Sequence, residues 1–364
     1  MDRRSLGLVV AGGGTGGHLY PGIAVARELL RRVPAARVSF AGTARGIEAR
    51  VVPKEGFELD LIRSAGLKGK SLTSRLRGAA LVPMGLVDAW RIVSRRRPSV
   101  VVGVGGYSSG PVVLAAALRG IPTMVLEQNA VPGLTNRWLA RWVRAAAVTF
   151  DETRAHFRGR AFVAGNPVRS EFFTSGEARR ADRSARARIL VLGGSQGARG
   201  INLALVAAAP ELARRIPDVD LVHQTGEREL DQVRQGYARA GVAARVVPYL
   251  DAVADEMTAA DLVIARAGAT TLAELAAAGR PAVLVPFPAA TDDHQRRNAM
   301  VVVNAGGAVM LDEVGLTGAQ LADVVEALLR DPARLAGMSN AMHTLARPDA
   351  AARIVDRLLE LAGA

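Results

Sequence analysis

Five glycines in six positions, followed by a histidine, form the first candidate site of the chain: Gly12-Gly13-Gly14-Thr15-Gly16-Gly17-His18. The loop directly follows an apolar run at residues 6–11 that predicts a β-strand. Glycines let a backbone approach a ligand closely, and the amides of a following helix attract negative charge. His18 would stand at the helix start, where an imidazole can exchange a proton near neutral pH. Taken alone, a histidine at this position is more often a polar helix cap.

Two other interpretations of this first glycine loop (residues 12–17) stay open. It satisfies the dinucleotide-binding pattern GxGxxG through Gly12, Gly14 and Gly17, but the acid expected about 20 residues later is absent from residues 38–43. A Walker loop is excluded because His18-Leu19 replaces its Lys-Ser/Thr. The loop can also be a tight turn that binds no ligand.

A second glycine loop (residues 103–110, GVGGYSSG) follows another apolar run, and Glu127-Gln128-Asn129 follows a third. The carboxyl ends of parallel strands meet at one edge of a sheet, where ligands bind in this class of fold. Two glycine loops and this polar cluster therefore predict a binding site at that edge.

The second half of the chain repeats the arrangement with other residue types. A third glycine loop (residues 193–197, GGSQG) combines helix-start amides with the Ser195 hydroxyl and suits a diphosphate, although it lacks a P-loop lysine. Arg169, in the segment GNPVR, could neutralise a phosphate or be an ordinary surface arginine. Glu274 lies about one turn into the helix predicted after RAGATT (residues 266–271) and could accept both hydroxyls of a ribose or complement the helix dipole. Asp292-Asp293-His294-Gln295 forms a further polar edge or a capped loop.

No metal site is predicted. Asp218-Val219-Asp220 has the Asp-x-Asp form but stands at the start of a predicted strand, at the opposite edge from the glycine loops. No His/Asp/Glu cluster has convincing ligand spacing. Amides and arginine could stabilise a diphosphate instead, so no cofactor is expected.

The elements that position these residues are repeated βα units. Short, non-alternating apolar runs are followed by glycines and then by segments of 3.6-residue periodicity, which indicates a parallel sheet covered on both faces. The uncharged residues 100–118 reach the length of a membrane span, but their glycines, proline and serines favour a strand, a loop and a helix. The sequence predicts an α/β protein with two doubly wound Rossmann-type domains that face a central cleft. We expect an N-terminal domain at residues 1–166 and a C-terminal domain at 167–364, whose last helix can pack back on the first, with a polar linker at 175–188.

Charge is distributed unevenly between these halves. The net charge is +13, and residues 1–166 carry 25 Lys+Arg against 10 Asp+Glu, whereas the rest of the chain is close to neutral. The densest basic stretch, residues 63–97, is interleaved with apolar residues. A basic surface admits nucleic acid, a membrane or an anionic substrate as partner. The absence of cysteine excludes disulfides and thiolate chemistry.

Taken together, the motifs are specific. The chain resembles the MurG family of peptidoglycan N-acetylglucosaminyltransferases, which have the GT-B fold. The resemblance covers both halves through eight segments: GGGTGGHLYPGIAVA (12–26), GVGGYSSGP (103–111), EQNAVPGLTNRWLA (127–140), GNPVR (165–169), LGGSQGARGIN (192–202), HQTG (223–226), RAGATTLAEL (266–275) and DHQRRNA (293–299).

This resemblance implies a glycosyltransferase that moves N-acetylglucosamine from its UDP donor to the C4 hydroxyl of the muramyl sugar of lipid I. The product is lipid II, with a β(1→4) linkage formed by inversion, and the expected location is peripheral, at the cytoplasmic face of the cell membrane. The implied partners are the UDP-sugar, lipid I, an anionic membrane surface and other cell-wall synthesis proteins, without nucleic acid.

The resemblance also implies roles for individual residues. His18 is the candidate general base, with Glu127 as second candidate. The implied substrate-binding residues are Thr15, Gly16, Gly17, Asn129, Arg169, Ser195, Leu250, Ala269, Thr270, Thr271, Glu274 and Gln295. Among them, Leu250 would lie by the uracil, Glu274 would hold the ribose and Gln295 the N-acetylglucosamine hydroxyls.

The basic stretch agrees with a lipid-linked acceptor, because basic residues near an anionic bilayer each contribute about 1 kcal/mol and apolar side chains can insert. The residues expected to touch the membrane are Lys68, Lys70, Arg75, Arg77, Leu81, Trp90 and Arg91. A solvated helix pair is the alternative.

Four other functions remain to be distinguished: a GT-B transferase acting on diacylglycerol or another lipid, a UDP-N-acetylglucosamine 2-epimerase, a nicotinamide oxidoreductase, and a nucleic-acid binder. The missing ribose acid disfavours the oxidoreductase. Because the basic stretch has little aromatic interleaving and carries no DNA-reading motif, nucleic-acid binding is also disfavoured.

Overall fold

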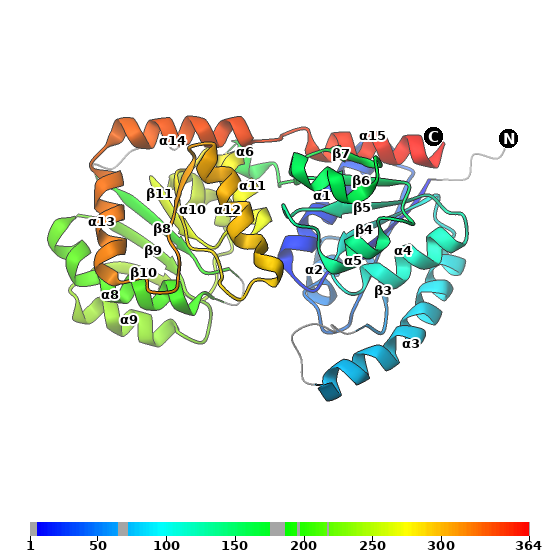
Figure 1. Cartoon of the computed structure of the whole chain (residues 1–364), viewed down its shortest axis with the longest axis horizontal. Helices are drawn as coiled ribbons and strands as arrows, with labels where there is room; N and C mark the ends of the chain where they lie inside the picture. The colour runs from blue at the N-terminus through cyan, green and yellow to red at the C-terminus, as the bar shows by residue number, and fades with distance from the viewer. Residues whose placement is uncertain (1–5, 65–71, 175–185, 195–196, 217, 364) are drawn as a thin grey trace. The chain divides into compact units, whose positions relative to one another are not determined.

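The computed structural model describes residues 6–64, 72–174, 186–194, 197–216 and 218–363, with the backbone alone at 72–82 (Figure 1). The chain forms two compact units. Unit 1 contains Met1–Val168 and Asp349–Ala364, and unit 2 contains Arg169–Pro348. The chain therefore enters unit 2 two residues after the predicted boundary and returns to unit 1 for its last helix.

Unit 1 is built on a parallel sheet in the order β3-β2-β1-β4-β5-β6-β7. Its strands are β1 (Gly7–Gly12), β2 (Arg37–Gly42), β3 (Glu58–Leu61), β4 (Val100–Gly105), β5 (Thr123–Glu127), β6 (Ala145–Val148) and β7 (Ala161–Val163). Every residue of β1 is buried, because alternate side chains enter cores on opposite faces of the sheet. Leu8 and Val10 belong to one core, and Val9 belongs to the other.

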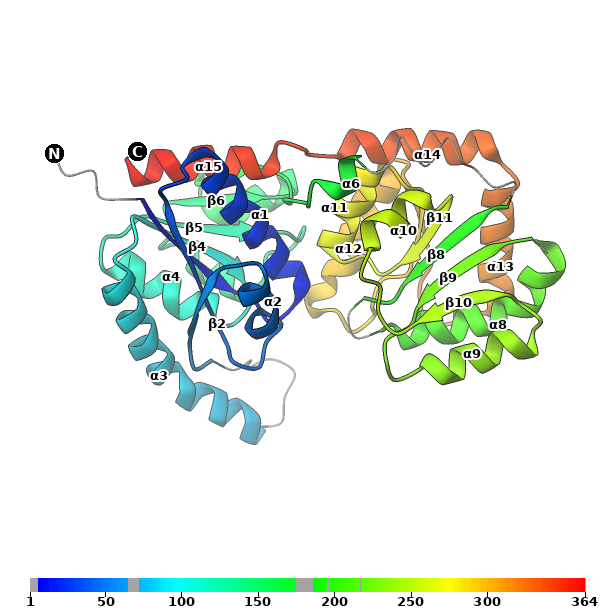
Figure 2. The same cartoon turned by 180° about the vertical axis from the view of Figure 1, so that it is seen from behind.

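Helices cover both faces of this sheet (Figure 2). They are α1 (Gly16–Arg32), α2 (Glu48–Lys54), α3 (Leu72–Arg96), α4 (Ser109–Leu118), α5 (Leu134–Leu139), the 3₁₀ helix η1 (Asp151–Phe157) and α15 (Ala350–Ala362). Side chains of α1, α2 and α15 enter the core of Leu8, whereas those of α3, α4 and α5 enter the core of Val9. The predicted strand, loop and helix at residues 100–118 are confirmed, and none of the described helices is long and apolar enough to span a membrane.

Unit 2 repeats the design with a parallel sheet in the order β10-β9-β8-β11-β12-β13. Its strands are β8 (Arg188–Leu192), β9 (Asp220–Gln224), β10 (Ala244–Val247), β11 (Leu262–Ala265), β12 (Ala282–Leu284) and β13 (Ala308–Met310). Its helices are α6 (Glu171–Thr174), α8 (Arg199–Arg215), α9 (Leu230–Arg239), α10 (Val253–Ala259), α11 (Ala269–Ala278), the 3₁₀ helix η2 (Thr291–Asp293), α12 (His294–Asn304), α13 (Gly318–Leu329) and α14 (Pro332–Leu345).

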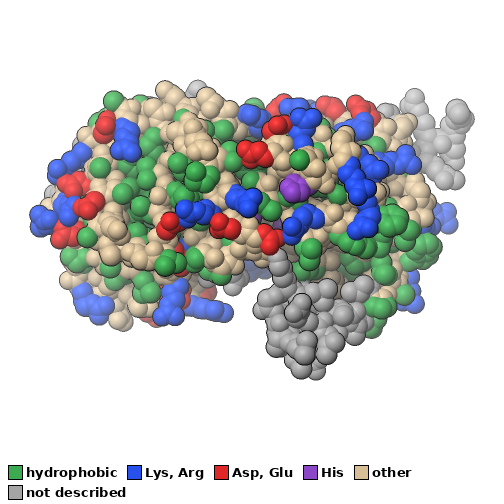
Figure 3. Space-filling model, in the orientation of Figure 1, with side chains coloured by type: hydrophobic (Ala, Val, Ile, Leu, Met, Phe, Trp, Pro, Cys, Tyr) green, Lys and Arg blue, Asp and Glu red, His purple; other side chains and the backbone are tan. Residues whose placement is uncertain are grey.

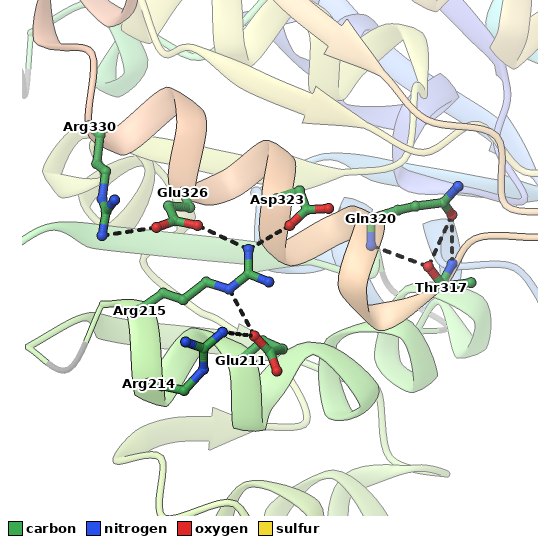
Figure 4. A network of polar contacts seen from close by, with 8 residues as sticks. All are labelled: Glu211, Arg214, Arg215, Thr317, Gln320, Asp323, Glu326 and Arg330. Carbon is green, nitrogen blue, oxygen red and sulfur yellow. Dashed lines mark hydrogen bonds and ion pairs between the residues drawn. The ribbon is translucent and has the colours of Figure 1, made fainter.

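An ionic network fastens α13 to α8 in unit 2 (Figure 4). Arg215, in the last turn of α8, contacts Glu211 of its own helix and Asp323 and Glu326 of α13. A capping box starts α13, in which the Thr317 hydroxyl accepts the Gln320 amide N–H. The ion pairs hold α13 against α8, and the capping box fixes the first turn of α13.

The expected linker at residues 175–188 is the one organisational prediction that the structure corrects. The change of unit occurs earlier, at Val168 and Arg169. Helix α6, which follows this change, packs against α10 and α11, and its Phe172 is buried. Residues 175–185 lie outside the described part of the chain.

Candidate functional site

Each sheet reverses its strand order at one point, and the glycine loops follow the strands at that point. In unit 1 the chain winds outward from β1 in one direction and from β4 in the other, and the first and second glycine loops follow β1 and β4. In unit 2 the corresponding strands are β8 and β11, followed by the third glycine loop and by Arg266-Ala267-Gly268. A doubly wound sheet binds its ligands at such a switch point.

The two glycine loops of unit 1 touch each other. A Cβ on Gly12 would lie 2.4 Å from the carbonyl oxygen of Gly105, and one on Gly106 would lie 2.6 Å from that of Gly13. Gly12, Gly105 and Gly106 also have positive φ. The contact therefore requires glycine on both sides, which explains the composition that the sequence shows.

His18 lies in the first turn of α1, above the second glycine loop. Its Nδ1 is 3.2 Å from the hydroxyl oxygen of Thr15, the N-cap residue of α1. The ring covers Gly105, since a Cβ there would lie 2.7 Å from the ring. His18, Gly16 and Gly17 are half-buried and Thr15 is exposed, so the predicted residues of this loop lie at one accessible surface.

Glu127 ends β5 and is 3% exposed. One carboxylate oxygen accepts the backbone N–H and the side-chain N–H of Asn129, and the other accepts the N–H of Gly133 and the Nδ2–H of Asn136. Burial raises the pKa of Glu127, while these hydrogen bonds oppose the rise. The carboxylate thus organises the segment between β5 and α5.

In unit 2, Glu274 and Arg169 come together although 105 positions separate them in the sequence. Glu274 lies on α11, which α6 contacts, and Arg169 immediately precedes α6. Burial raises the pKa of Glu274 to about 7, and the Arg169 guanidinium opposes the rise. The Arg169 guanidinium also lies over the ring of Phe172, 5.2 Å from its centre. Ala269, Thr270 and Thr271 form the first turn of the same helix, where backbone N–H groups have no partner within the helix.

Two glutamines tie together loops around this site. The Gln224 side chain donates to the carbonyl oxygens of Gly194 and Pro248, which joins the third glycine loop to the segment that contains Leu250. Gln295 accepts the N–H of Phe287 at 2.9 Å. Leu250 is buried, and Gln295 is half-buried.

The turn before Gln295 is strained. Asp292 and Asp293 have φ values of 55° and 52°, a region that residues with a Cβ seldom adopt. Such strain persists where surrounding structure imposes it, often at functional sites.

A buried neutral histidine, His223, lies in β9 and contacts Asn202 of α8 and Tyr237 of α9. Asn202 donates its Nδ2–H to the carbonyl oxygen of Thr225, so its Oδ1 faces His223 Nε2, which must carry the proton. His223 Nδ1 then accepts from the hydroxyl of Tyr237 at 2.8 Å. Burial lowers the pKa of His223 to about 3, so this residue stays neutral and serves packing.

Sequence reasoning missed two carboxylates at these switch points. Glu48 contacts the first glycine loop through Gly14. Glu313 forms an ion pair with Arg266, whose guanidinium also donates to the carbonyl oxygens of Val285 and Pro286. Each lies far from its partner in the sequence, and only the folded chain joins them.

Several predicted residues lie outside the described parts of the chain: Ser195, Lys68 and Lys70 are not described, and of Arg75, Arg77 and Leu81 only the helical backbone is. Trp90 and Arg91 are exposed on α3. Asp220 of the Asp-x-Asp segment pairs with Arg188. No group of three or more potential metal ligands occurs among the described residues.

Both halves of the chain match models of one enzyme family. The glycosyltransferase family 28 N-terminal domain matches residues 8–148, and the C-terminal domain of that family matches residues 188–354. The fold and both family matches are those of a two-domain glycosyltransferase with the GT-B architecture.

Similarity to individual proteins shows which family of these glycosyltransferases the chain resembles. The UDP-N-acetylglucosamine–N-acetylmuramyl-(pentapeptide) pyrophosphoryl-undecaprenol N-acetylglucosamine transferase of Myxococcus xanthus is 47% identical over 355 residues, which are 97% of this chain and 92% of that protein. A crystal structure of MurG from Acinetobacter baumannii has a TM-score of 0.78 at 30% identity, covering 98% of this chain and 99% of that one. The chain belongs to the MurG family.

One alternative from the sequence shares only the fold. A UDP-GlcNAc 2-epimerase from Neisseria meningitidis, solved with bound UDP-GlcNAc, has a TM-score of 0.71 at 15% identity and covers 98% of this chain and 100% of that one. This likeness reflects a common architecture of two Rossmann-type units.

Proposed function

We infer that the protein transfers N-acetylglucosamine from UDP-N-acetylglucosamine to the C4 hydroxyl of the muramyl sugar of lipid I and so forms lipid II for peptidoglycan. The observation that carries this conclusion is the 47% identity, over 97% of the chain, to a relative that bears the name of this transferase. The position of the candidate residues at both switch points supports it.

In the proposed reaction His18 acts as general base. The imidazole takes the proton of the acceptor hydroxyl while that oxygen bonds to C1 of the donor sugar, and the bond from C1 to the phosphate oxygen breaks with its electron pair leaving on UDP. Attack from the face opposite UDP inverts C1. The accessible position of His18 at the start of α1 and its contact with the Thr15 hydroxyl support this role.

The donor is assigned to unit 2. Glu274 would accept the ribose hydroxyls, and Arg169 would neutralise the diphosphate together with the first-turn amides of α11. The uracil would lie by Leu250, and Gln295 would hold hydroxyls of the N-acetylglucosamine. The electrostatic interaction of Arg169 with Glu274 supports the assignment, because it brings a cation for phosphate near an acceptor for ribose.

For Glu127 we propose a positioning role instead of proton transfer. All four of its hydrogen bonds come from N–H groups of residues 129–136, so a catalytic proton could reach it only if that segment rearranged. Its effect would be to fix Asn129, the predicted contact to the donor sugar.

A transfer assay tests the function. Purified protein is incubated with UDP-N-acetylglucosamine and a short-chain lipid I analogue, and UDP release is followed with and without chelator. We expect release that depends on the acceptor and persists in chelator. Release without acceptor, or no release, contradicts the proposal; conversion of the donor sugar alone identifies the epimerase, and activity on diacylglycerol identifies the other lipid transferase.

We further propose that the outer surface of α3 and α4 docks on an anionic membrane. Met84, Val87 and Trp90 of α3 and Leu118 of α4 are 41–58% exposed, and the Arg119 guanidinium lies 5.0 Å from the centre of the Trp90 ring. Figure 3 shows hydrophobic side chains gathered beside basic ones on the side of unit 1 that carries α3 and α4. A half-exposed tryptophan among apolar and basic side chains suits a bilayer interface.

Part of the basic stretch has a structural role. Arg96 bonds the buried Asp60 of β3 at 2.8 Å, and Arg63 forms a two-pronged pair with Asp88 at 2.7 and 2.8 Å. These pairs tie α3 to the sheet edge. Arg91 is exposed on α3 and has only an electrostatic interaction with Asp88 among these pairs, so we assign it to an external anion.

Vesicle binding tests this surface. Reversing Arg75, Arg77 and Arg91 to Glu should weaken co-sedimentation with anionic vesicles in a salt-dependent way. The control is Arg50→Glu, an exposed arginine of α2, which packs on the opposite face of the sheet. Equal binding by the triple variant, or an equal loss in the control, refutes the assignment.

A further inference from the structure

Glu48 is a fully buried carboxylate at the first position of α2. Its Oε2 accepts the backbone N–H of Gly14 at 2.7 Å, and its Oε1 accepts both the N–H and the hydroxyl of Thr43 at 2.8 Å. The side chain therefore joins the first glycine loop to the end of β2.

Three glycines make room for this carboxylate. A Cβ on Gly13, Gly42 or Gly46 would lie within 2.1–2.5 Å of Glu48 atoms, so Glu48 could not keep its present position beside it. Gly13 belongs to the first glycine loop, while Gly42 and Gly46 flank Thr43. The socket thus has walls from two separate segments and is fitted to this one side chain.

The contacts indicate that the Glu48 carboxylate serves to position the backbone that it contacts. Its two oxygens face only donors, which is the pattern of an ionised group, yet Glu48 has no ion pair within the described chain. Burying an unpaired charge opposes folding, and an apolar side chain of similar volume would fill the socket without that cost. An apolar side chain, however, could not accept a hydrogen bond from the N–H of Gly14.

Gly14 connects this carboxylate to the proposed base. It has φ of 84° and directly precedes Thr15, the N-cap residue whose hydroxyl oxygen lies 3.2 Å from His18 Nδ1. On the other side, the carbonyl of Gly13 packs against Gly106, next to the Gly105 that the His18 ring covers. A shift of Gly13 and Gly14 would therefore move both supports of the imidazole.

We propose that Glu48 is a positioning residue for transfer: it fixes the backbone of Gly14 and, through Thr15, the orientation of the His18 imidazole toward the acceptor hydroxyl. The proposal rests on the proposed role of His18. Because the carboxylate accepts the N–H of Gly14, this N–H is not available to a phosphate. This part of the loop would therefore orient the base and would not bind a phosphate.

Three variants test the proposal. Glu48→Gln places an N–H where the loop offers only donors, and Glu48→Asp keeps the charge but is one methylene too short to span Gly14 and Thr43. Thr43→Val is the control, because it removes the hydroxyl that donates to Glu48 and accepts the N–H of Gly46 but leaves the bond to Gly14 in place. Thermal unfolding identifies the variants that fold.

Steady-state kinetics and histidine NMR are the readouts. In folded Glu48 variants we expect kcat with the lipid I analogue to fall roughly 100-fold, as for a misplaced catalytic group. The KM for UDP-N-acetylglucosamine should change less than about twofold, since the residues proposed to bind its uracil, ribose and diphosphate lie in unit 2 and are untouched. The side-chain ¹⁵N signals of His18, assigned with His18→Gln, should shift in the Glu48 variants and stay unchanged in Thr43→Val.

The outcomes separate this proposal from the function on which it rests. If a folded Glu48 variant keeps both kcat and the His18 signals, the positioning role is wrong. If Thr43→Val loses as much kcat as Glu48→Asp, the effect is general to the segment and the proposal is also wrong. If the unaltered protein transfers nothing to lipid I, the proposed function fails, while the NMR comparison still decides whether Glu48 orients His18.

Discussion

Lowering the pH from 8 to 6 should weaken binding of the UDP-sugar, because Glu274 changes its protonation state in this interval. Burial raises the pKa of its carboxyl from 4.5 to about 7, although the Arg169 guanidinium opposes the rise. An ionised carboxylate accepts two ribose hydroxyls through charge-assisted hydrogen bonds, which are about twice as strong as neutral ones. Donor affinity should therefore follow the ionised fraction of Glu274.

The size of the effect follows from that pKa. A group with a pKa of about 7 is about 90% ionised at pH 8 and about 10% ionised at pH 6. When only the ionised form is competent, the apparent dissociation constant is the intrinsic one divided by that fraction. The KM for UDP-N-acetylglucosamine should thus rise roughly tenfold between pH 8 and pH 6.

The assay measures KM for the donor from pH 6 to 8.5 at saturating lipid I analogue, with Glu274→Gln as control. The variant should have a raised KM at pH 8 and almost no dependence on pH, because its amide does not titrate. Any effect of His18 on the transfer step should appear in kcat, which is measured separately from KM. A flat profile in the unaltered protein, or the same slope in Glu274→Gln, would refute the reasoning.

Two further substitutions should separate packing from catalysis. Leu358→Ala removes a fully buried side chain of α15 from the core of unit 1 and should lower the free energy of unfolding by about 2–5 kcal/mol, measured by urea denaturation; a loss below 1 kcal/mol would contradict the packing of this helix. Gly105→Ala places a Cβ 2.7 Å from the His18 ring at a residue with φ of 98°, so kcat should fall while the donor KM stays nearly constant. An unchanged kcat would argue against His18 as base.

Much of the fold could be predicted from the sequence because the pattern that specifies it is local. Buried parallel strands need short apolar runs, and the loops after them need glycine for close approach, so both signals lie within a few residues. The strand predicted at residues 189–192 and the helix predicted to about residue 216 correspond to β8 and α8. The strand order of each sheet then places the glycine loops at its switch point.

The missed residues act over long sequence separations. Glu48 bonds Gly14 across 34 positions, and Arg266 pairs with Glu313 across 47. The dinucleotide-binding pattern places its ribose-binding acid at about residues 38–43, and Glu48 lies just beyond that range. Here the acid faces the loop itself, and its only sequence signal is a set of glycines around it, Gly42 and Gly46 among them.

The linker prediction failed for a related reason. Polar, arginine-rich composition at residues 175–188 indicates exposure, but exposure does not determine where a chain changes from one unit to the other. The change lies at Val168 and Arg169, and soon after it α6, with its buried Phe172, packs on α10 and α11. A single aromatic residue in a four-residue helix carries little weight in a composition profile.

The return of α15 to unit 1 has a consequence for how the protein is made. Ile354, Val355 and Leu358 complete the core that contains Leu8. They are translated only after the whole of unit 2, so the first unit to leave the ribosome is the last to gain its full core. Domains usually fold in order of synthesis. Here unit 2, which needs no later segment, can finish folding first, and the unit that carries His18 matures only when residues 349–364 arrive.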